Sequence, residues 1–350
     1  MKKIISIGTI EEIEEKDIEI KHLPFNDLFS IKNQQNIVSQ TLFPLTFEER
    51  KKIFLEHLKS PSNNLKYKRY IGSPLRYPGG KSLAVGLIIK YFPDNIKRIV
   101  SPFFGGGSVE IAAAKELGIE VLGFDIFDIL VNYWKIQIEK PKKLYDNLLA
   151  INPTKEAYEI VKSKLKAHWK KEIVLHPLEL ATYFYFNHNL SYGPGFLGWI
   201  SKIYEDKKKY YSMIEKVRDF NAKNIKVECD AFENVIPKFN DDFLYCDPPY
   251  YLGDDSTLFH GVYPQRNFPI YHDNFNHKLL RDLLNKHKGS FVLSYNDCPT
   301  IREWYKNYKI FNVSWQYTMG QGETRIGLNR IKENRNHIKK SNEILIVQDG

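Results

Sequence analysis

Cysteine is scarce in this chain of 350 residues, which has only Cys229, Cys246 and Cys298. The three are far apart and odd in number, so they provide neither a disulfide framework nor the ligand spacing of a structural zinc site. We therefore expect a cytoplasmic protein that works in a reducing environment and binds no metal.

Long apolar runs are missing as well. No segment approaches the roughly 18 apolar residues that a membrane span requires. The opening "MKKIISIGTIEEIEEKD" places acids directly after a few apolar residues, unlike a secretory signal. With 43% hydrophobic residues the chain can still build a sizeable core. We expect a globular protein that has no membrane partner.

Positive charge, by contrast, is plentiful and unevenly distributed. The formal net charge is +9, and residues 134–172 hold ten lysines against five acids. A second basic stretch covers residues 325–340. Such an excess suits a polyanion such as nucleic acid, although a lysine-rich helix can equally be a solvated surface.

From about residue 70 the chain alternates strand and helix patterns. "RIVSPFFGGGSVEIAAAKELG" predicts a strand, a glycine loop and a helix that ends at Gly118, and residues 120–124 predict a strand that ends at Asp125. Further apolar strands are predicted in "IKVECDAF", "DFLYCDPPYY", "SFVLSYND" and "NEILIVQ". This alternation predicts an α/β fold with a mainly parallel sheet.

The alternation of strand and helix patterns is interrupted once. Residues 140–221 contain lysine-rich helical patterns and the aromatic segment "YFYFNHNLSYGPGFLGW", and they read as an inserted module. We therefore expect one α/β domain made of residues 71–139 and 222–350. Residues 1–70 form an appended segment in which "LTFEERKKIFLEHLKS" has helical spacing.

Four features follow predicted strands: the glycine loop 105–107, Asp125, Asp230 and Asp247. Ligands of open parallel sheets bind at the carboxyl ends of the strands, so these four features should line one crevice. Glycines let a ligand approach the backbone closely. Glu110 follows where a dinucleotide fingerprint would continue, which weakens a nicotinamide interpretation.

The segment "CDPPYY" ends its strand abruptly, because two prolines remove two backbone donors and fix φ. Asp247 and the rigid carbonyls behind it can accept hydrogen bonds from a flat amine, and Tyr250 offers a ring for stacking. A simple strand-ending turn is the alternative.

Taken together, "SPLRYPGGK", "PFFGGG", "GFD", "CDAFE" and "DPPYY", in this order and with a large insertion before the last two, resemble the Dam-type (α-class) adenine-specific DNA methyltransferases. The resemblance covers roughly residues 72–347. It implies a Rossmann-like methyltransferase sheet, mostly parallel with helices on both faces, and an inserted, mainly helical target-recognition domain at 140–221.

The resemblance also implies a cofactor, S-adenosylmethionine, and a set of site residues. The cofactor-binding candidates are Tyr77, Gly79, Lys81, Phe103, Phe104, Gly105, Gly107, Asp125, Asp230 and Asp247. The catalytic candidates are Asp247, Pro248, Pro249 and Tyr250. One position departs from the family: Ser101 stands where an acid commonly precedes the Pro-Phe of the glycine loop, which puts the contacts to the methionine amino group in doubt.

The implied activity is methyl transfer to N6 of an adenine flipped out of double-stranded DNA. Candidates for base contacts in the insertion are Asn187, His188, Asn189, Tyr192 and Lys202, although each can equally stabilise a loop. A restriction endonuclease that shares the target is a possible partner, and we expect a monomer or a weak dimer.

Three alternatives stay open at this point. The same loop can hold the N4 amine of cytosine, although that subclass more often has Ser before the prolines. RNA or protein amino-methyltransferases resemble an Asn-Pro-Pro-Tyr pattern instead. A DNA-binding protein that has lost catalysis would keep the fold and the cofactor without turnover.

Overall fold

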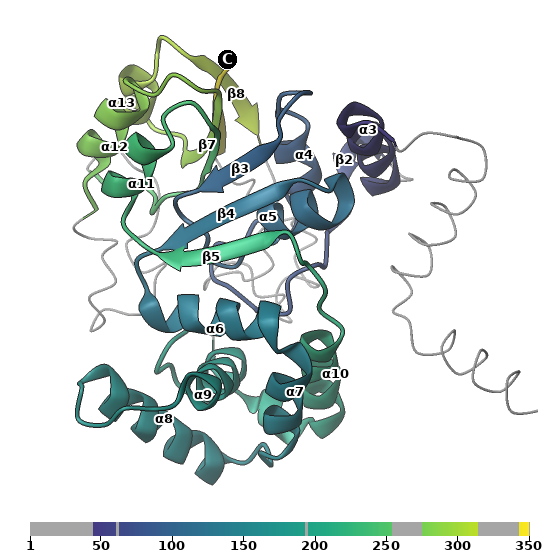
Figure 1. Ribbon diagram of the computed structural model, residues 1–350, viewed down its shortest axis with the longest axis vertical. Coiled ribbons are helices and arrows are strands. Elements are labelled where there is room, and N and C mark those ends of the chain that lie inside the picture. Colours follow the sequence, from purple (N-terminus) through teal and green to yellow (C-terminus); the bar gives the residue numbers. More distant parts are fainter. Residues whose placement is uncertain (1–44, 61–62, 193–194, 254–274, 314–342, 350) are drawn as a thin grey trace, which may run out of the picture. The chain divides into compact units, whose positions relative to one another are not determined.

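The computed structural model describes residues 45–60, 63–192, 195–253, 275–313 and 343–349 (Figure 1). The chain divides into two compact units, 1–49 and 50–350, and the site lies wholly in the second. Most of the appended segment, residues 1–44, and the second basic stretch, 325–340, lie outside the described residues.

Helix α3, Phe47–Leu58, forms where helical spacing predicted it. It begins with a capping box, in which the Thr46 hydroxyl accepts from the Glu49 backbone N–H (3.3 Å) and the Glu49 carboxylate accepts from the Thr46 N–H (2.8 Å). Two short antiparallel strands that the sequence did not predict follow it, β1 (Lys59–Ser60) and β2 (Asn63–Tyr67).

The core of the second unit is a seven-stranded sheet with the order β5-β4-β3-β6-β7-β9-β8. The strands are β3 (Arg98–Ser101), β4 (Glu120–Asp125), β5 (Ile225–Cys229), β6 (Phe243–Cys246), β7 (Phe291–Asn296), β8 (Lys309–Val313) and β9 (Glu343–Gln348). The first five in this order are parallel, and β9 runs antiparallel to both of its neighbours. The predicted α/β class and mostly parallel, Rossmann-like sheet are thus confirmed.

Strand β6 is buried on both faces, which explains its unbroken apolar sequence. Leu244 and Cys246 face the core built with α11 (Phe232–Lys238), α12 (His277–Leu284) and α13 (Pro299–Trp304). Phe243 and Tyr245 alternate with them and pack against Phe92, which follows α4 (Val85–Ile89). Helices therefore cover both faces of the sheet.

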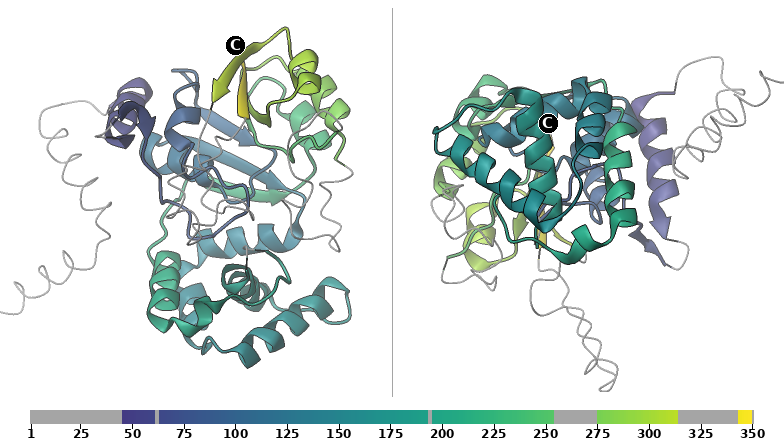
Figure 2. Two further views of the ribbon diagram at one scale, coloured as in Figure 1. Left: turned by 180° about the vertical axis from the view of Figure 1, so that it is seen from behind. Right: turned by 90° about the horizontal axis from the view of Figure 1, so that it is seen from below.

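A helical segment separates β4 from β5. It comprises α6 (Asp128–Glu139), α7 (Pro141–Leu149), α8 (Lys155–Trp169), α9 (Pro177–Leu190), a 3-10 turn (Lys202–Glu205) and α10 (Lys207–Arg218). Helix α6 packs on β4 and β5 and also on α9, and Figures 1 and 2 show it between β5 and the helices α8 and α9. Helix α6 therefore joins the helical segment to the sheet.

Two details differ from the sequence prediction. The apolar pattern of residues 81–91, followed by Pro93, predicts a helix, but only α4 is helical, because turns continue through residue 84 after the Pro78-Gly79-Gly80 loop. Strand β8 was not predicted, since it is only partly buried and its "KIFNV" lacks the unbroken apolar run of a buried strand such as β6. Among the described residues, no helix has both the length and the apolar character to cross a bilayer.

Candidate active site at the carboxyl ends of the parallel strands

Strands β5, β4, β3 and β6 are parallel neighbours, so their carboxyl ends meet at one edge of the sheet. Asp230 follows β5, Asp125 ends β4, the loop 102–107 follows β3, and Asp247 follows β6. The fold therefore gathers all four predicted features at the same edge.

The glycine loop needs its glycines. Gly105 and Gly107 have φ values of 48° and 63°, which side chains rarely tolerate. A Cβ on Gly106 would lie 2.6 Å from the Cβ of Tyr77. Tyr77 thus packs directly against this loop.

Two groups fix the loop. The Gly105 N–H donates to the Asp125 carboxylate (3.0 Å), and the Trp134 indole N–H donates to the Gly105 carbonyl (2.9 Å). Asp125 also accepts from the Phe127 N–H (3.0 Å). Burial raises the pKa of Asp125, and these backbone donors limit the rise.

The other predicted cofactor residues frame this loop. Phe104 is buried against Trp134, whereas Phe103 packs against Phe232 on the other face of the sheet. Asp230 is half-buried, and its pKa is lowered because it accepts from the Asn234 side chain. The carboxylate is therefore ionised at neutral pH.

Asp247 lies beside a buried ammonium group. The Nζ of Lys81 is 2.7 Å and 2.8 Å from the two Asp247 carboxylate oxygens and donates to the Gly79 carbonyl (3.1 Å). The same Nζ lies over the ring of Tyr250, 5.0 Å from its centroid. Burial raises the pKa of Asp247, and Lys81 opposes that rise.

Side chains of β7 and β9 contact Tyr250 and hold it in place. Its hydroxyl donates to the buried carboxylate of Glu343 on β9 and lies 3.2 Å from the hydroxyl of Ser294 on β7. Its ring stacks on Tyr295, with centroids 6.2 Å apart. The prolines before it continue the rigid loop, with Pro248 buried and Pro249 half-buried. The ring orientation is thereby fixed by strands remote in sequence.

Residues 77–319 match the family described as D12 class N6 adenine-specific DNA methyltransferase. The chain belongs to this family. It is 29% identical over 287 residues to the Type II methyltransferase M.FokI of Planomicrobium okeanokoites, an alignment that covers 74% of this chain and 42% of that protein. It is 26% identical over 302 residues to the modification methylase StsI of Streptococcus sanguinis, covering 79% and 44% respectively. The chain spans less than half the length of these two relatives.

Ser101, at the position where the resemblance led us to expect an acid, lies at the end of β3. The hydroxyl of Ser101 donates to the carboxylate of Glu110 (2.7 Å), one turn into α5 (Ser108–Ala112). Both side chains are buried. Burial raises the pKa of Glu110 to about 7, although the Ser101 hydroxyl favours the ionised form.

This raised pKa gives a testable dependence of stability on pH. Between the ordinary glutamate value of 4.5 and about 7, the folded protein holds a proton on Glu110 that the unfolded chain has released. The free energy of unfolding therefore falls as pH rises through this window, by about 3 kcal/mol. The Glu110→Gln variant has no proton to release at this position, so its free energy of unfolding should not fall in this way. The difference between the free energies of unfolding of the variant and the wild type, measured in urea, should therefore grow in the variant's favour between about pH 5 and pH 8. A constant difference would contradict the assignment.

The predicted base-contact residues of this member of the D12 family fall into two groups. Asn187, His188 and Asn189, near the end of α9, are buried. The Asn189 side chain accepts from the Arg76 backbone N–H (3.0 Å), and His188 Nε2 donates to the Arg76 carbonyl (2.8 Å). The Asn187 side chain accepts from the backbone N–H of Leu197 (2.8 Å). These are the contacts of residues that stabilise a loop, which was the alternative to base contacts for all three residues.

His188 has a further role in the site. Its ring stacks on Tyr77, with centroids 5.9 Å apart. Burial lowers the pKa of His188 to about 4, so the ring is neutral at physiological pH. Helix α9 thus supports the loop that carries Tyr77 and Lys81.

The other two candidates are on the surface. Tyr192 is 60% exposed, and Lys202 is exposed on the 3-10 turn. The lysines of residues 134–172 are exposed too, apart from the half-buried Lys162. Tyr158, which lies among the lysines of α8, is fully buried.

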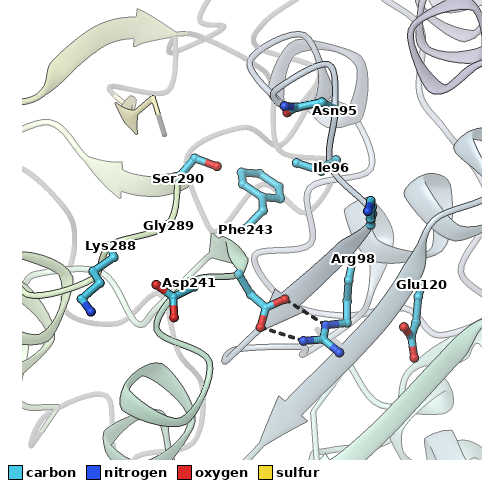
Figure 3. A pocket seen from close by; sticks show the side chains of 11 residues that line it. Asn95, Ile96, Arg98, Glu120, Asp241, Phe243, Lys288, Gly289 and Ser290 are labelled. Atoms are coloured by element: carbon cyan, nitrogen blue, oxygen red, sulfur yellow. Dashed lines mark hydrogen bonds and ion pairs between the residues drawn. The ribbon is translucent and has the colours of Figure 1, made fainter.

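A cavity of about 600 Å³ lies at the opposite ends of the same strands (Figure 3). It is lined by Arg98 at the start of β3 and by Asp242 and Phe243 at the start of β6. Arg98 donates to both carboxylate oxygens of Asp242 (3.0 and 2.8 Å). Because no predicted site residue lines this cavity, we place the chemistry at the carboxyl ends.

Sequence reasoning missed several residues that shape the site. Trp134 and Glu343 act through contacts across the fold, and no local pattern marks them. Glu110 was noted only as a break in a glycine fingerprint. Its spacing of nine residues from Ser101, across the glycine loop, is the signal that could have paired them.

Proposed function

We propose that this chain is a site-specific DNA methyltransferase that transfers the methyl group of S-adenosylmethionine to N6 of adenine in double-stranded DNA. Membership of the D12 family supports the reaction class. The main structural support is the Lys81 contact, because it places a nitrogen donor on Asp247 and over the face of Tyr250. The exocyclic amine of a base stacked on Tyr250 would need the same two contacts, a carboxylate that accepts its hydrogen bonds and an aromatic face beside it.

The described residues fit the cofactor. The glycine loop has a left-handed backbone at Gly105 and Gly107, Tyr77 packs directly on it, and Asp125 accepts from the Gly105 N–H. Glycine loops of this kind, between a strand and a helix, bind ligands through the backbone. We propose that Asp125 and Asp230 bind the ribose and adenine parts, with Phe103, Phe104, Gly79 and Lys81 completing the site. When bound, S-adenosylmethionine supplies an electrophilic methyl group on a sulfonium.

The residues of the chain then orient the target amine. Asp247 and the Pro248 carbonyl accept its two N–H groups, which directs the nitrogen lone pair away from the ring. Asp247 also stabilises the positive charge that develops on the nitrogen. The adenine must leave the helix to reach this loop, and Tyr250 provides the surface on which it stacks.

The exposed lysines of α7, α8 and the adjoining turns supply positive surface for the DNA backbone. Tyr192 and Lys202 are the accessible candidates for base contacts. We further propose a role in restriction-modification, supported by the relative named a modification methylase. An endonuclease with the same target, a monomeric or weakly dimeric state and a cytoplasmic location belong to the same proposal.

The test is transfer of a labelled methyl group from S-adenosylmethionine to unmethylated genomic DNA, followed by nucleoside mass spectrometry. We expect N6-methyladenine at one short recurring sequence. N4-methylcytosine would instead indicate the cytosine enzyme. Cofactor binding without any modified base would indicate a DNA-binding protein that has lost catalysis.

A further inference from the structure

Glu110 on α5 places a buried carboxylate at the end of β3, and the proposed function leaves its role unassigned. We propose that Glu110 receives the ammonium group of the methionine part of S-adenosylmethionine, a task that an acid at position 101 would otherwise perform. This inference rests on the proposed function, because it concerns the cofactor of the same site.

The first argument is position. Glu110 follows the glycine loop by one helical turn, and its side chain folds back to the end of β3, where Ser101 donates to it (2.7 Å). The carboxylate therefore reaches the strand end at which an acid at position 101 would lie. A serine at that position hydrogen-bonds to a carboxylate, whereas a second acid would repel it.

The second argument is charge. Asp247 has Lys81 beside it, and Asp125 has two backbone N–H donors. Glu110 is 3% exposed, yet among the described residues no lysine, arginine or histidine forms an ion pair with it. Buried carboxylates ordinarily have a cationic partner. A ligand that brings an ammonium group would supply one.

The third argument concerns the proton. Burial raises the pKa of Glu110 most, and the negative charge of Asp247 raises it further, while Ser101 on β3 and the backbone of α5 lower it. With a pKa of about 7, Glu110 is partly protonated at neutral pH. A bound ammonium group would favour the carboxylate, so cofactor binding should release a proton.

The experiment is calorimetric titration of the full chain with three ligands: S-adenosylmethionine, S-adenosylhomocysteine and 5′-methylthioadenosine. The third ligand keeps the nucleoside and lacks the amino acid. Glu110→Gln should weaken binding of the first two roughly ten- to a hundredfold and leave the third unchanged. Titration in buffers of different ionisation enthalpy should show proton release for the wild type and little for the variant.

Two further variants sharpen the result. Glu120→Gln changes an exposed glutamate at the start of β4 and should leave all three affinities unchanged. Ser101→Asp combined with Glu110→Gln returns an acid to the strand end and should restore the preference for ligands that carry the amino acid. If that preference does not return, positions 101 and 110 do not serve one subsite.

The outcomes are distinct. Equal weakening of all three ligands by Glu110→Gln would show a structural role, and no weakening would show no role; either result overturns the inference. A wild-type chain that binds 5′-methylthioadenosine but not S-adenosylmethionine would also overturn it. A wild-type chain that binds none of the ligands would overturn the proposed function itself.

Discussion

Replacing Asp247 with asparagine should reduce methyl transfer at saturating S-adenosylmethionine roughly a thousandfold. The change removes the negative charge that we expect to face the developing charge on N6. It also turns part of the acceptor into an amide N–H donor, which opposes the N–H groups of the target. The effect should appear in the single-turnover rate on a duplex that contains the target, since that rate isolates the chemical step.

Asp241→Asn is the matched control. Asp241 is an exposed acid just before β6, beside the cavity at the far end of the strand, so the same change of charge there should leave the rate unaltered. If Asp247→Asn retained the wild-type single-turnover rate, Asp247 would not hold the reacting amine and the mechanism would be wrong.

Tyr250→Ala should lower turnover by about a hundredfold, because a flipped base loses its stacking surface, and stacking contributes about 1–3 kcal/mol per base. The variant should also be less stable by about 3–5 kcal/mol, since a buried ring is deleted. A duplex with 2-aminopurine at the target position reports base flipping directly through its fluorescence.

Tyr250→Phe separates stacking from anchoring. It keeps the ring and removes the hydroxyl that binds Glu343 and Ser294, so it should lose stability and keep most of the fluorescence increase. If the alanine variant kept both the fluorescence increase and the turnover of the wild type, Tyr250 would not be the stacking surface.

Much of the fold was predictable because its signals are local. Strands buried on both faces, such as β6, are short apolar runs, and the prolines after Cys246 mark where the strand ends. Gly118 ends its helix with φ 72°, as its type and position predicted. Since these signals repeat in order along the chain, they predicted both the parallel sheet and the edge of the sheet at which the candidate site lies.

The rest depends on contacts between distant segments. Asparagine is a residue type that often contacts bases, but Asn189 is buried. Its side chain instead accepts a hydrogen bond from the backbone N–H of Arg76, which is far away in sequence, in the loop before α4. Glu343 likewise meets Tyr250 only after β9 has joined the sheet. Polar residues of this kind have the same local pattern whether they bind DNA or hold the interior together.

The helical segment between β4 and β5 also affects how the chain reaches its folded state. These strands are neighbours in register, with Val121 opposite Ile225, yet the whole segment 126–224 separates them in sequence. Closing so long a loop is entropically costly and slows folding unless intervening contacts shorten it. Helices α6 to α10 contact one another, α6 with α9 and α7 with α10, and these contacts bring β5 toward β4. Since β5 lies at the edge of the sheet, its docking can come late, after the central strands have paired.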